Sequence, residues 1–152
     1  ASAECRSPKK EGQDEAIGCG KGGLSTKIHA TTDALGNPTG FLLTPGQASD
    51  LEGADALLPD LKAQTLLADK AYDADERVLD PLQQAGKTAV IPPKRNRVVR
   101  RSHDQELYKE RHLIENFFCK LKQFRAIATR YDKTARHFLA AIYLASTLIW
   151  LN

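Results

Sequence analysis

The spacing of apolar and polar residues along the chain predicts short strands that alternate with helices. Apolar and polar residues alternate from Leu24 to Thr31, which is the period of a half-buried strand. Turn-forming residues at 33–38 separate it from a second strand, Gly40–Thr44, so the two predict a β-hairpin. Two short apolar runs, Thr65–Ala68 and Thr88–Ile91, are typical of strands that are buried on both faces.

Helical signals lie between and after these strands. Ser49 and Asp50 are N-cap residues for a helix that ends before Pro59, and Gly86 ends the next helix. A longer helical pattern starts near Asp104, and the last apolar segment also predicts a helix. The predicted helices span about 50–58, 75–84, 104–124 and 138–151. This order predicts an α/β domain with a mixed sheet over residues 18–152, preceded by a poorly structured polar leader at 1–17.

Composition restricts the class of protein. The chain has 152 residues, enough for one domain, and its 41% hydrophobic and 27% charged residues are ordinary for a globular protein. Its three cysteines are widely spaced and form no CxxC pair, which argues against a zinc site and a secreted disulfide framework. The longest apolar stretch, Phe138–Leu151, is shorter than the roughly 20 residues of a membrane-spanning helix. We therefore expect a cytoplasmic protein without a membrane partner.

Charge is distributed unevenly. Residues 94–136 contain 13 Lys and Arg against 5 Asp and Glu, whereas the rest of the chain contains 9 against 14. A basic segment beside an acidic remainder indicates a polyanion such as DNA as the partner, together with a separate carboxylate site. The alternative is a solvated charged surface with no partner. The candidate DNA-binding residues of the loop that opens this segment are Lys94, Arg95, Arg97, Arg100 and Arg101.

Two acids are candidates for that carboxylate site. Asp69 directly follows a predicted buried strand, and ligands of open α/β sheets bind beyond the carboxyl ends of strands. Glu115 lies on the predicted long helix, beside an apolar stripe. An aspartate at a strand end that faces a glutamate on a packed helix suits Mg²⁺, which takes one or two protein carboxylates together with water and phosphate oxygens. The alternative for Asp69 is an acid that only starts the next loop.

The surroundings of Glu115 on that helix are cationic. At about 100° per residue, Tyr108, Arg111 and Lys122 share with Glu115 a stripe roughly 60° wide. Cations on such a stripe suit a phosphate backbone. The alternative is that Arg111 and Glu115 form an ordinary i,i+4 helix pair. The predicted buried side of the helix consists of Leu107, Ile114, Phe117 and Leu121, with Glu110 as an exception.

Several motifs resemble one large group of insertion-sequence transposases of the DDE type. Tyr108, Arg111, Glu115 and Lys122 reproduce the group's Y-(2)-R-(3)-E-(6)-K spacing. The segment LADKAYD at 67–73 is similar to the second-acid motif ADKGYD, with Ala in place of Gly. GGLSTKIHATTDALGNP, LLTPGQASD and FRAIATRYDKTARHFLA are further segments similar to the family, in the same order. Each motif has modest specificity, but together they cover nearly the whole chain.

The resemblance implies a ribonuclease-H-like, retroviral-integrase-like fold and DNA cleavage and strand transfer at the ends of an insertion sequence. It implies that Asp69 and Glu115 are the second and third catalytic acids and ligands of a two-ion Mg²⁺ or Mn²⁺ site. It implies that Tyr108, Arg111 and Lys122 support this site and hold donor DNA. The implied partners are double-stranded DNA at element ends and targets and further copies of the chain, in a bacterial cytoplasm.

One part of the family pattern is absent. The first Asp of the family lies on a strand before GGLSTKIHA, normally the centre of the sheet, and residues 1–17 contain no such strand. We therefore expect the carboxyl-terminal part of a catalytic domain, from a truncated or split reading frame whose upstream half supplies the first Asp. Two alternatives stay open: a non-catalytic DNA-binding remnant of a transposase, and a small metal-dependent nuclease unrelated to transposition.

Overall fold

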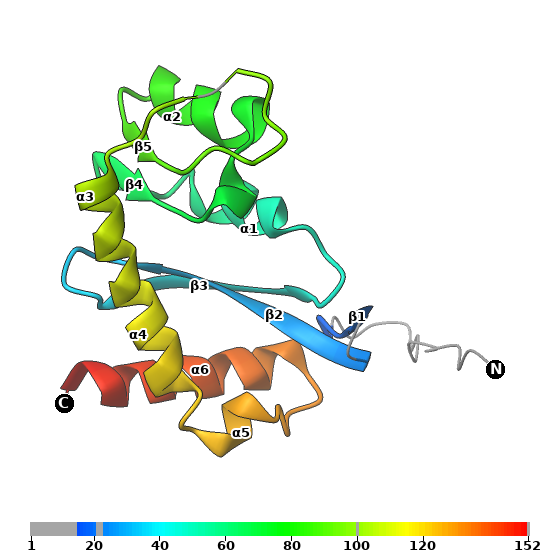
Figure 1. The fold of residues 1–152 in the computed structure, drawn as a ribbon. Helices are drawn as coiled ribbons and strands as arrows, with labels where there is room; N and C mark the ends of the chain where they lie inside the picture. The colour runs from blue at the N-terminus through cyan, green and yellow to red at the C-terminus, as the bar shows by residue number, and fades with distance from the viewer. Residues whose placement is uncertain (1–14, 21–22, 100, 152) are drawn as a thin grey trace.

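Two sheets of different construction organise the chain (Figure 1). The computed structural model describes residues 15–20, 23–99 and 101–151. The first sheet is antiparallel, in the order β1 (Gly18–Gly20), β2 (Gly23–Thr32), β3 (Pro38–Pro45). The second is a parallel pair formed by β4 (Thr65–Leu67) and β5 (Thr88–Val90).

The β2–β3 hairpin follows from its turn residues and its alternation. The Asp33 carboxylate accepts the N–H groups of Leu35 and Asn37, both at 2.9 Å, and Gly36 adopts a φ of +85°, which glycine takes without strain. Ile28 and Ala30 of β2 then face one hydrophobic core, while Lys27 and His29 face helix α1 (Asp50–Leu57) on the other side.

The hairpin packs on the helices that end the chain. Helix α6 (Ala135–Leu151) runs under the antiparallel sheet, and α4 (His112–Leu121) and α5 (Arg125–Ala128) lie beside it (Figure 1). Apolar burial on folding favours this arrangement, because the side chains that meet there are large and nearly inaccessible. The buried members of this core are Phe41, Phe117, Leu121, Ile127, Phe138, Ile142 and Ala145.

A second core supports the parallel pair. Helix α1 is capped by Ser49, whose hydroxyl and the Glu52 carboxylate form a capping box. A π-helical turn at Asp75–Leu79 leads into α2 (Asp80–Gln84), and these helices cover β4 and β5. The buried residues of this core are Ala54, Val78, Leu79, Leu82 and Ile91.

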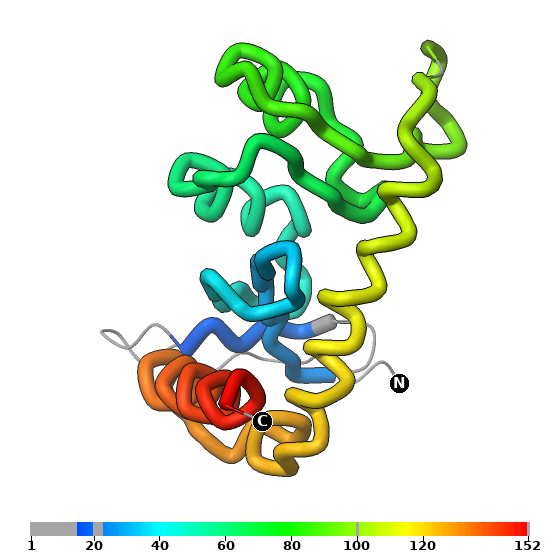
Figure 2. The backbone as a smooth tube through the Cα atoms, turned by 90° about the vertical axis from the view of Figure 1, so that its left-hand side faces the viewer, coloured from blue at the N-terminus to red at the C-terminus, as the bar shows by residue number. Residues whose placement is uncertain are grey.

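One helical segment spans both halves of the molecule. It consists of α3 (Gln105–Tyr108), a 3-10 turn at Lys109–Arg111, and α4. In two perpendicular views it starts beside the parallel pair and descends to the antiparallel sheet and α6 (Figures 1 and 2). This segment therefore places its middle residues, including Arg111, close to the end of β4.

The α/β class is confirmed, but two details of the predicted architecture are wrong. The strands of the described part of the chain form two sheets instead of one mixed sheet, since no strand joins β2 to β4 there. The predicted helix 104–124 contains a tighter 3-10 turn in its middle and ends at Leu121. A ribonuclease-H-like topology stays a prediction.

Two further segments complete the comparison with the sequence. Helix α5 and strand β1 have no counterpart among the predicted elements. Residues 1–14 of the predicted leader lie outside the described residues, whereas Ala16 is buried and its carbonyl accepts the Thr26 hydroxyl at 2.6 Å. Within the described residues, no helix combines the length and apolar character needed to cross a membrane.

Candidate functional site

Asp69 lies where the parallel pair ends. The N–H of Ala68 donates to the carbonyl of Val90 at 3.3 Å, so strand pairing continues to the residue before Asp69. Oδ1 of Asp69 then accepts the N–H of Ala71 at 3.3 Å and caps the 3-10 turn Lys70–Tyr72. The side chain stays 46% exposed. One carboxylate oxygen of Asp69 is therefore used by the turn, and the other faces the long helical segment.

Arg111 joins the two predicted catalytic acids. Its Nη1 lies 3.8 Å from Oδ2 of Asp69, and its Nη2 donates to Oε1 of Glu115 one turn further along the helix. The guanidinium is more buried than either carboxylate. Asp69 and Glu115 thus both contact one cation. The shared cation relieves the repulsion between two neighbouring carboxylates.

Tyr108 completes the cationic side of this cluster. Its ring lies 5.5 Å from the guanidinium carbon of Arg111, which is cation–π distance, and His103 packs edge-on against the same ring. Tyr108 therefore limits where the Arg111 side chain can go. The buried side of the helix is confirmed at Phe117 and Leu121 but wrong at Leu107, which is exposed.

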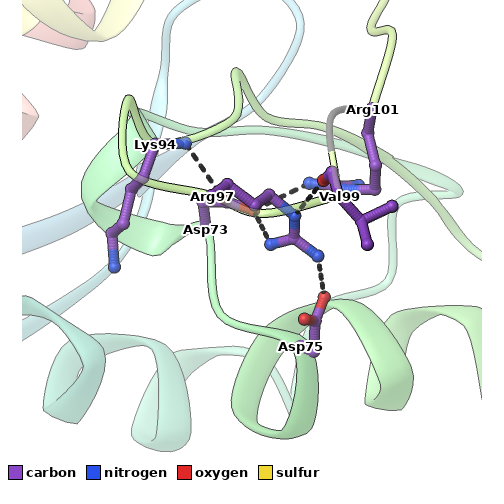
Figure 3. Close-up of polar contacts among 6 residues, drawn as sticks. All are labelled: Asp73, Asp75, Lys94, Arg97, Val99 and Arg101. Carbon is purple, nitrogen blue, oxygen red and sulfur yellow. Dashed lines mark hydrogen bonds and ion pairs between the residues drawn. The ribbon is translucent and has the colours of Figure 1, made fainter.

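A second polar cluster was not expected from the sequence (Figure 3). Asp73 follows the 3-10 turn after Asp69, and its side chain is only 1% exposed. Oδ2 accepts the backbone N–H of Lys94 at 2.7 Å, while Oδ1 accepts Nη1 of Arg97 at 2.6 Å and Nη2 of Arg101 at 2.8 Å. Arg97 also donates to Asp75. We call Asp73, Arg97 and Arg101 the Asp73 clasp.

The clasp has a definite protonation state. Burial alone raises the pKa of the Asp73 carboxyl, but the hydrogen bonds from Lys94, Arg97 and Arg101 outweigh it, so the pKa lies below the usual value of 3.8. The Asp73 carboxylate is therefore charged at neutral pH and holds two guanidinium groups. A signal for this role existed in the sequence, since Asp73 ends the LADKAYD segment, but neither strand nor helix periodicity identified its partners.

The other candidate DNA-binding residues differ in their surroundings. Arg95 and Lys122 are exposed, and the Lys94 side chain is half-buried. The described part of the chain supplies no carboxylate within ion-pair distance of these three cations, so their charge is available to an external anion. Arg100 lies outside the described residues. The cations of the basic loop thus fall into two kinds, those held by Asp73 and those open to solvent.

His29 is a buried polar residue that the sequence did not single out. Its Nε2 lies 2.8 Å from the Thr44 hydroxyl, and its ring packs against Gly53 of α1. Desolvation lowers the pKa of His29 below 6.5, against the opposing effect of Asp50 and with a smaller contribution from Lys27. His29 is therefore neutral at physiological pH and forms part of the packing that seats α1 on the hairpin.

The donor set at Asp69 and Glu115 is suited to a hard divalent cation, although it is incomplete. Two carboxylates that already share a guanidinium offer the oxygen ligands that Mg²⁺ prefers. Across residues 15–20, 23–99 and 101–151 there is no group of three His, Cys, Asp or Glu side chains able to hold a metal ion. The described residues therefore fit part of a metal site.

An α/β domain with one acid at a strand end and another on a helix, both beside cations, corresponds to the class of DDE-type domains. Comparison with known families agrees: the model of the family "Transposase DDE domain" matches residues 4–150. The chain belongs to this family.

Comparison with individual proteins agrees with the family match. The chain is 42% identical over 130 residues to a Brucella ovis protein named "Putative transposase for insertion sequence element IS6501". The match covers 85% of this chain and 100% of that protein. No solved structure matches the chain. An insertion-sequence transposase family thus contains the chain, as its motifs indicated.

Proposed function

We propose that this chain carries the second and third acids of a transposase that cleaves and joins DNA at the ends of an insertion sequence. The observation that carries the proposal is the contact of Asp69 and Glu115 with one guanidinium, that of Arg111. Family membership supports the same reaction class. Asp69 and Glu115 are the proposed catalytic residues and metal ligands.

The proposed reaction is an in-line displacement at phosphorus. The oxygen of a water molecule or of a 3′-hydroxyl forms a bond to phosphorus, the bond to the bridging 3′-oxygen breaks, and the leaving oxygen ends as a hydroxyl. Mg²⁺ or Mn²⁺, when bound, would supply Lewis acidity to this displacement. Asp69 and Glu115 would hold the ions, and the exposed cations would neutralise phosphate.

DNA contacts are proposed on the surface next to these acids. Tyr108 and Arg111 flank Glu115 at the start of α4, and Lys122 follows its last turn. The basic loop approaches the segment after Asp69 from the other side, through the contact of Asp73 with Lys94, Arg97 and Arg101. The proposed DNA-binding set is therefore Tyr108, Arg111, Lys122, Lys94, Arg95, Arg97, Arg100 and Arg101.

A third carboxylate has to complete the site. Asp69 and Glu115 are the two acids that the described residues bring to Arg111, and the family motif implies a first Asp upstream. We propose that an upstream segment of a split or longer reading frame provides this Asp on the strand that completes a ribonuclease-H-like sheet. The active form is proposed to be an oligomer in the bacterial cytoplasm.

Complementation tests this function. The chain is mixed with an upstream fragment that carries the first Asp, and cleavage of element-end DNA is followed with Mg²⁺ or Mn²⁺. The expected result is nicking that requires both fragments, the metal ion, Asp69 and Glu115. Cleavage that survives Asp69→Asn or Glu115→Gln would show that the site assignment is wrong, and cleavage without preference for terminal repeats would indicate an unrelated nuclease.

A non-catalytic DNA-binding role is the second candidate. The absence of a third metal-binding side chain near Asp69 and Glu115 among the described residues favours it. This role predicts binding that weakens steeply with salt, because phosphate contacts release counterions, and no cleavage under any condition of the complementation assay.

A further inference from the structure

In the Asp73 clasp, two arginines of the basic loop bind the same carboxylate oxygen of Asp73. Oδ1 of Asp73 accepts from Arg97 and from Arg101, so these two guanidinium groups converge on the same buried oxygen (Figure 3). The N–H of Lys94 fixes the other oxygen. Val98, which directly follows Arg97, is 97% exposed.

Arg97 is committed to contacts within the protein, because each of its three nitrogens already donates a hydrogen bond. Nη1 donates to Asp73, Nη2 donates to Asp75, and Nε donates to the carbonyl of Val99 at 3.0 Å. Its side chain is 15% exposed. A guanidinium that is largely buried and already paired with two carboxylates offers phosphate little accessible surface, and phosphate that displaced either carboxylate would break an ion pair of the protein.

Arg101 is held in a similar way. Nη2 donates to Asp73, and Nε is buried without a hydrogen-bond partner among the described residues. Removing the guanidinium from Asp73 would leave a carboxylate that is almost fully buried with less compensation, which is strongly unfavourable. The carboxylates of Asp73 and Asp75 together balance the two guanidinium charges of Arg97 and Arg101 within the protein.

Lys94 and Arg95 contrast with the clasp arginines. Asp73 uses only the backbone N–H of Lys94, and the Lys94 side chain extends away from the clasp (Figure 3). Arg95 is exposed. The clasp thus fixes the backbone from which these two cations extend, close to the turn that Asp69 caps.

We propose that Asp73 is a positioning residue, which uses Arg97 and Arg101 as anchors of the basic loop and leaves Lys94 and Arg95 to bind DNA phosphate. This inference rests on the proposed function in DNA binding and refines its residue set. The loop is then a prearranged phosphate-binding element beside Asp69, instead of a flexible basic stretch in which every arginine contacts DNA.

The salt dependence of DNA binding distinguishes arginines that anchor the loop from side chains that contact DNA phosphate. Binding of fluorescein-labelled random-sequence duplex DNA to the full chain is measured over a range of salt concentrations, since phosphate contacts do not depend on sequence. Arg95→Ala should reduce the slope of log K against log salt by about 0.9 and leave the melting temperature unchanged. Arg97→Ala should lower the melting temperature and change the slope by less than half as much.

A conservative variant tests whether the stability contributed by Arg97 depends on its planar guanidinium group or only on its positive charge. Arg97→Lys keeps the positive charge but cannot serve Asp73, Asp75 and the Val99 carbonyl together. We expect it to lose as much thermal stability as Arg97→Ala. If Arg97→Lys keeps the stability while Arg97→Ala loses one phosphate contact in the salt slope, Arg97 binds DNA and the proposal is wrong.

Asp73→Asn gives the most distinctive result. It removes the carboxylate charge that pairs with both arginines and keeps the shape of the side chain, so the guanidinium groups become available to phosphate. The slope should steepen by about 0.9 or more, while protease cleavage within the loop becomes faster. Asp60→Asn, which removes an exposed carboxylate outside the clasp, should change neither quantity.

Failure of the positioning role of Asp73 can be distinguished from failure of the proposed DNA-binding function. An unchanged or shallower slope in folded Asp73→Asn would overturn the positioning role. If Asp73→Asn does not fold, Arg97→Lys and Arg95→Ala decide the question. If the unaltered chain binds no DNA, the proposed function fails. The anchoring role is then judged by protease cleavage of the loop: faster cleavage in Arg97→Lys than in Arg95→Ala supports it, and equal cleavage contradicts it.

Discussion

Nη1 of Arg111 lies 3.8 Å from Oδ2 of Asp69, and this contact connects the end of the parallel strand pair to the long helical segment. The same guanidinium binds Glu115. An arginine between two acids holds them near one another and offsets part of their charge. In the proposed function, Asp69 and Glu115 would hold a divalent ion that takes over this charge compensation, and Arg111 would then be available to phosphate.

The acids of the site are predicted to be necessary for cleavage and unnecessary for folding. In the complemented protein, Asp69→Asn and Glu115→Gln should each reduce metal-dependent cleavage by more than about 100-fold, since loss of groups one step further from a metal already costs about 10–100-fold. Both side chains are about half exposed, so melting temperatures should change little. Asp60→Asn serves as the control of equal charge change. Full activity in either site variant would contradict the assignment.

Arg111→Gln is predicted to affect DNA binding more than stability. In the Arg111–Glu115 pair the Glu115 side chain is exposed, and the arginine precedes the glutamate, which is the less favourable order of charges on a helix. Loss of this pair should therefore lower the free energy of unfolding by less than about 0.5 kcal/mol. The salt slope of DNA binding should fall by about 0.9. Arg125→Gln, an exposed arginine on α5, is the matched control and should leave the slope unchanged. A large loss of stability with an unaltered slope would make Arg111 a structural residue.

Much of the fold follows from local patterns. The strand pattern at Leu24–Thr31 and the capping residues at Ser49 correspond to β2 and to α1, because period and cap chemistry act within a few residues. The positions of Asp69 after β4 and of Glu115 on α4 also follow from local patterns, whereas their shared contact with Arg111 is a finding of the structure.

The remaining features depend on contacts between distant segments. Polar alternation in β2 predicted a solvated face for His29, but α1 covers that face and buries the ring. The charge of Arg97 and Arg101 predicted DNA contact, and only the folded chain shows that both are ion-paired with Asp73. Sequence periodicity reports which face of an element is apolar. It does not report which partner covers the polar face.

Gly53→Ala is predicted to destabilise the protein although Gly53 lies in a helix. Alanine favours a helix over glycine by about 1 kcal/mol. A Cβ at Gly53, however, would lie 2.5 Å from Cγ of the buried His29 ring, and overpacking costs about 1–3 kcal/mol. Urea unfolding should show a net loss of stability. Ala56→Gly, at an exposed site of the same helix, measures the effect of helix propensity alone. A Gly53→Ala variant more stable than the unaltered chain would show that the His29 ring can shift to accommodate the added methyl group.

His29 is predicted to make stability depend on pH in the range where histidine titrates. Its pKa in the folded protein lies below the unfolded value of 6.5, so the unfolded chain binds the proton more readily as pH falls. Stability should therefore be complete above pH 6.5 and decrease below it, by at most about 1.4 kcal/mol per pH unit for one proton. Urea unfolding between about pH 5 and pH 8 measures this slope. His29→Gln should flatten it, because glutamine does not titrate, whereas His137→Gln at an exposed position should leave it as it is. The same slope in both variants would mean that another group causes the pH dependence.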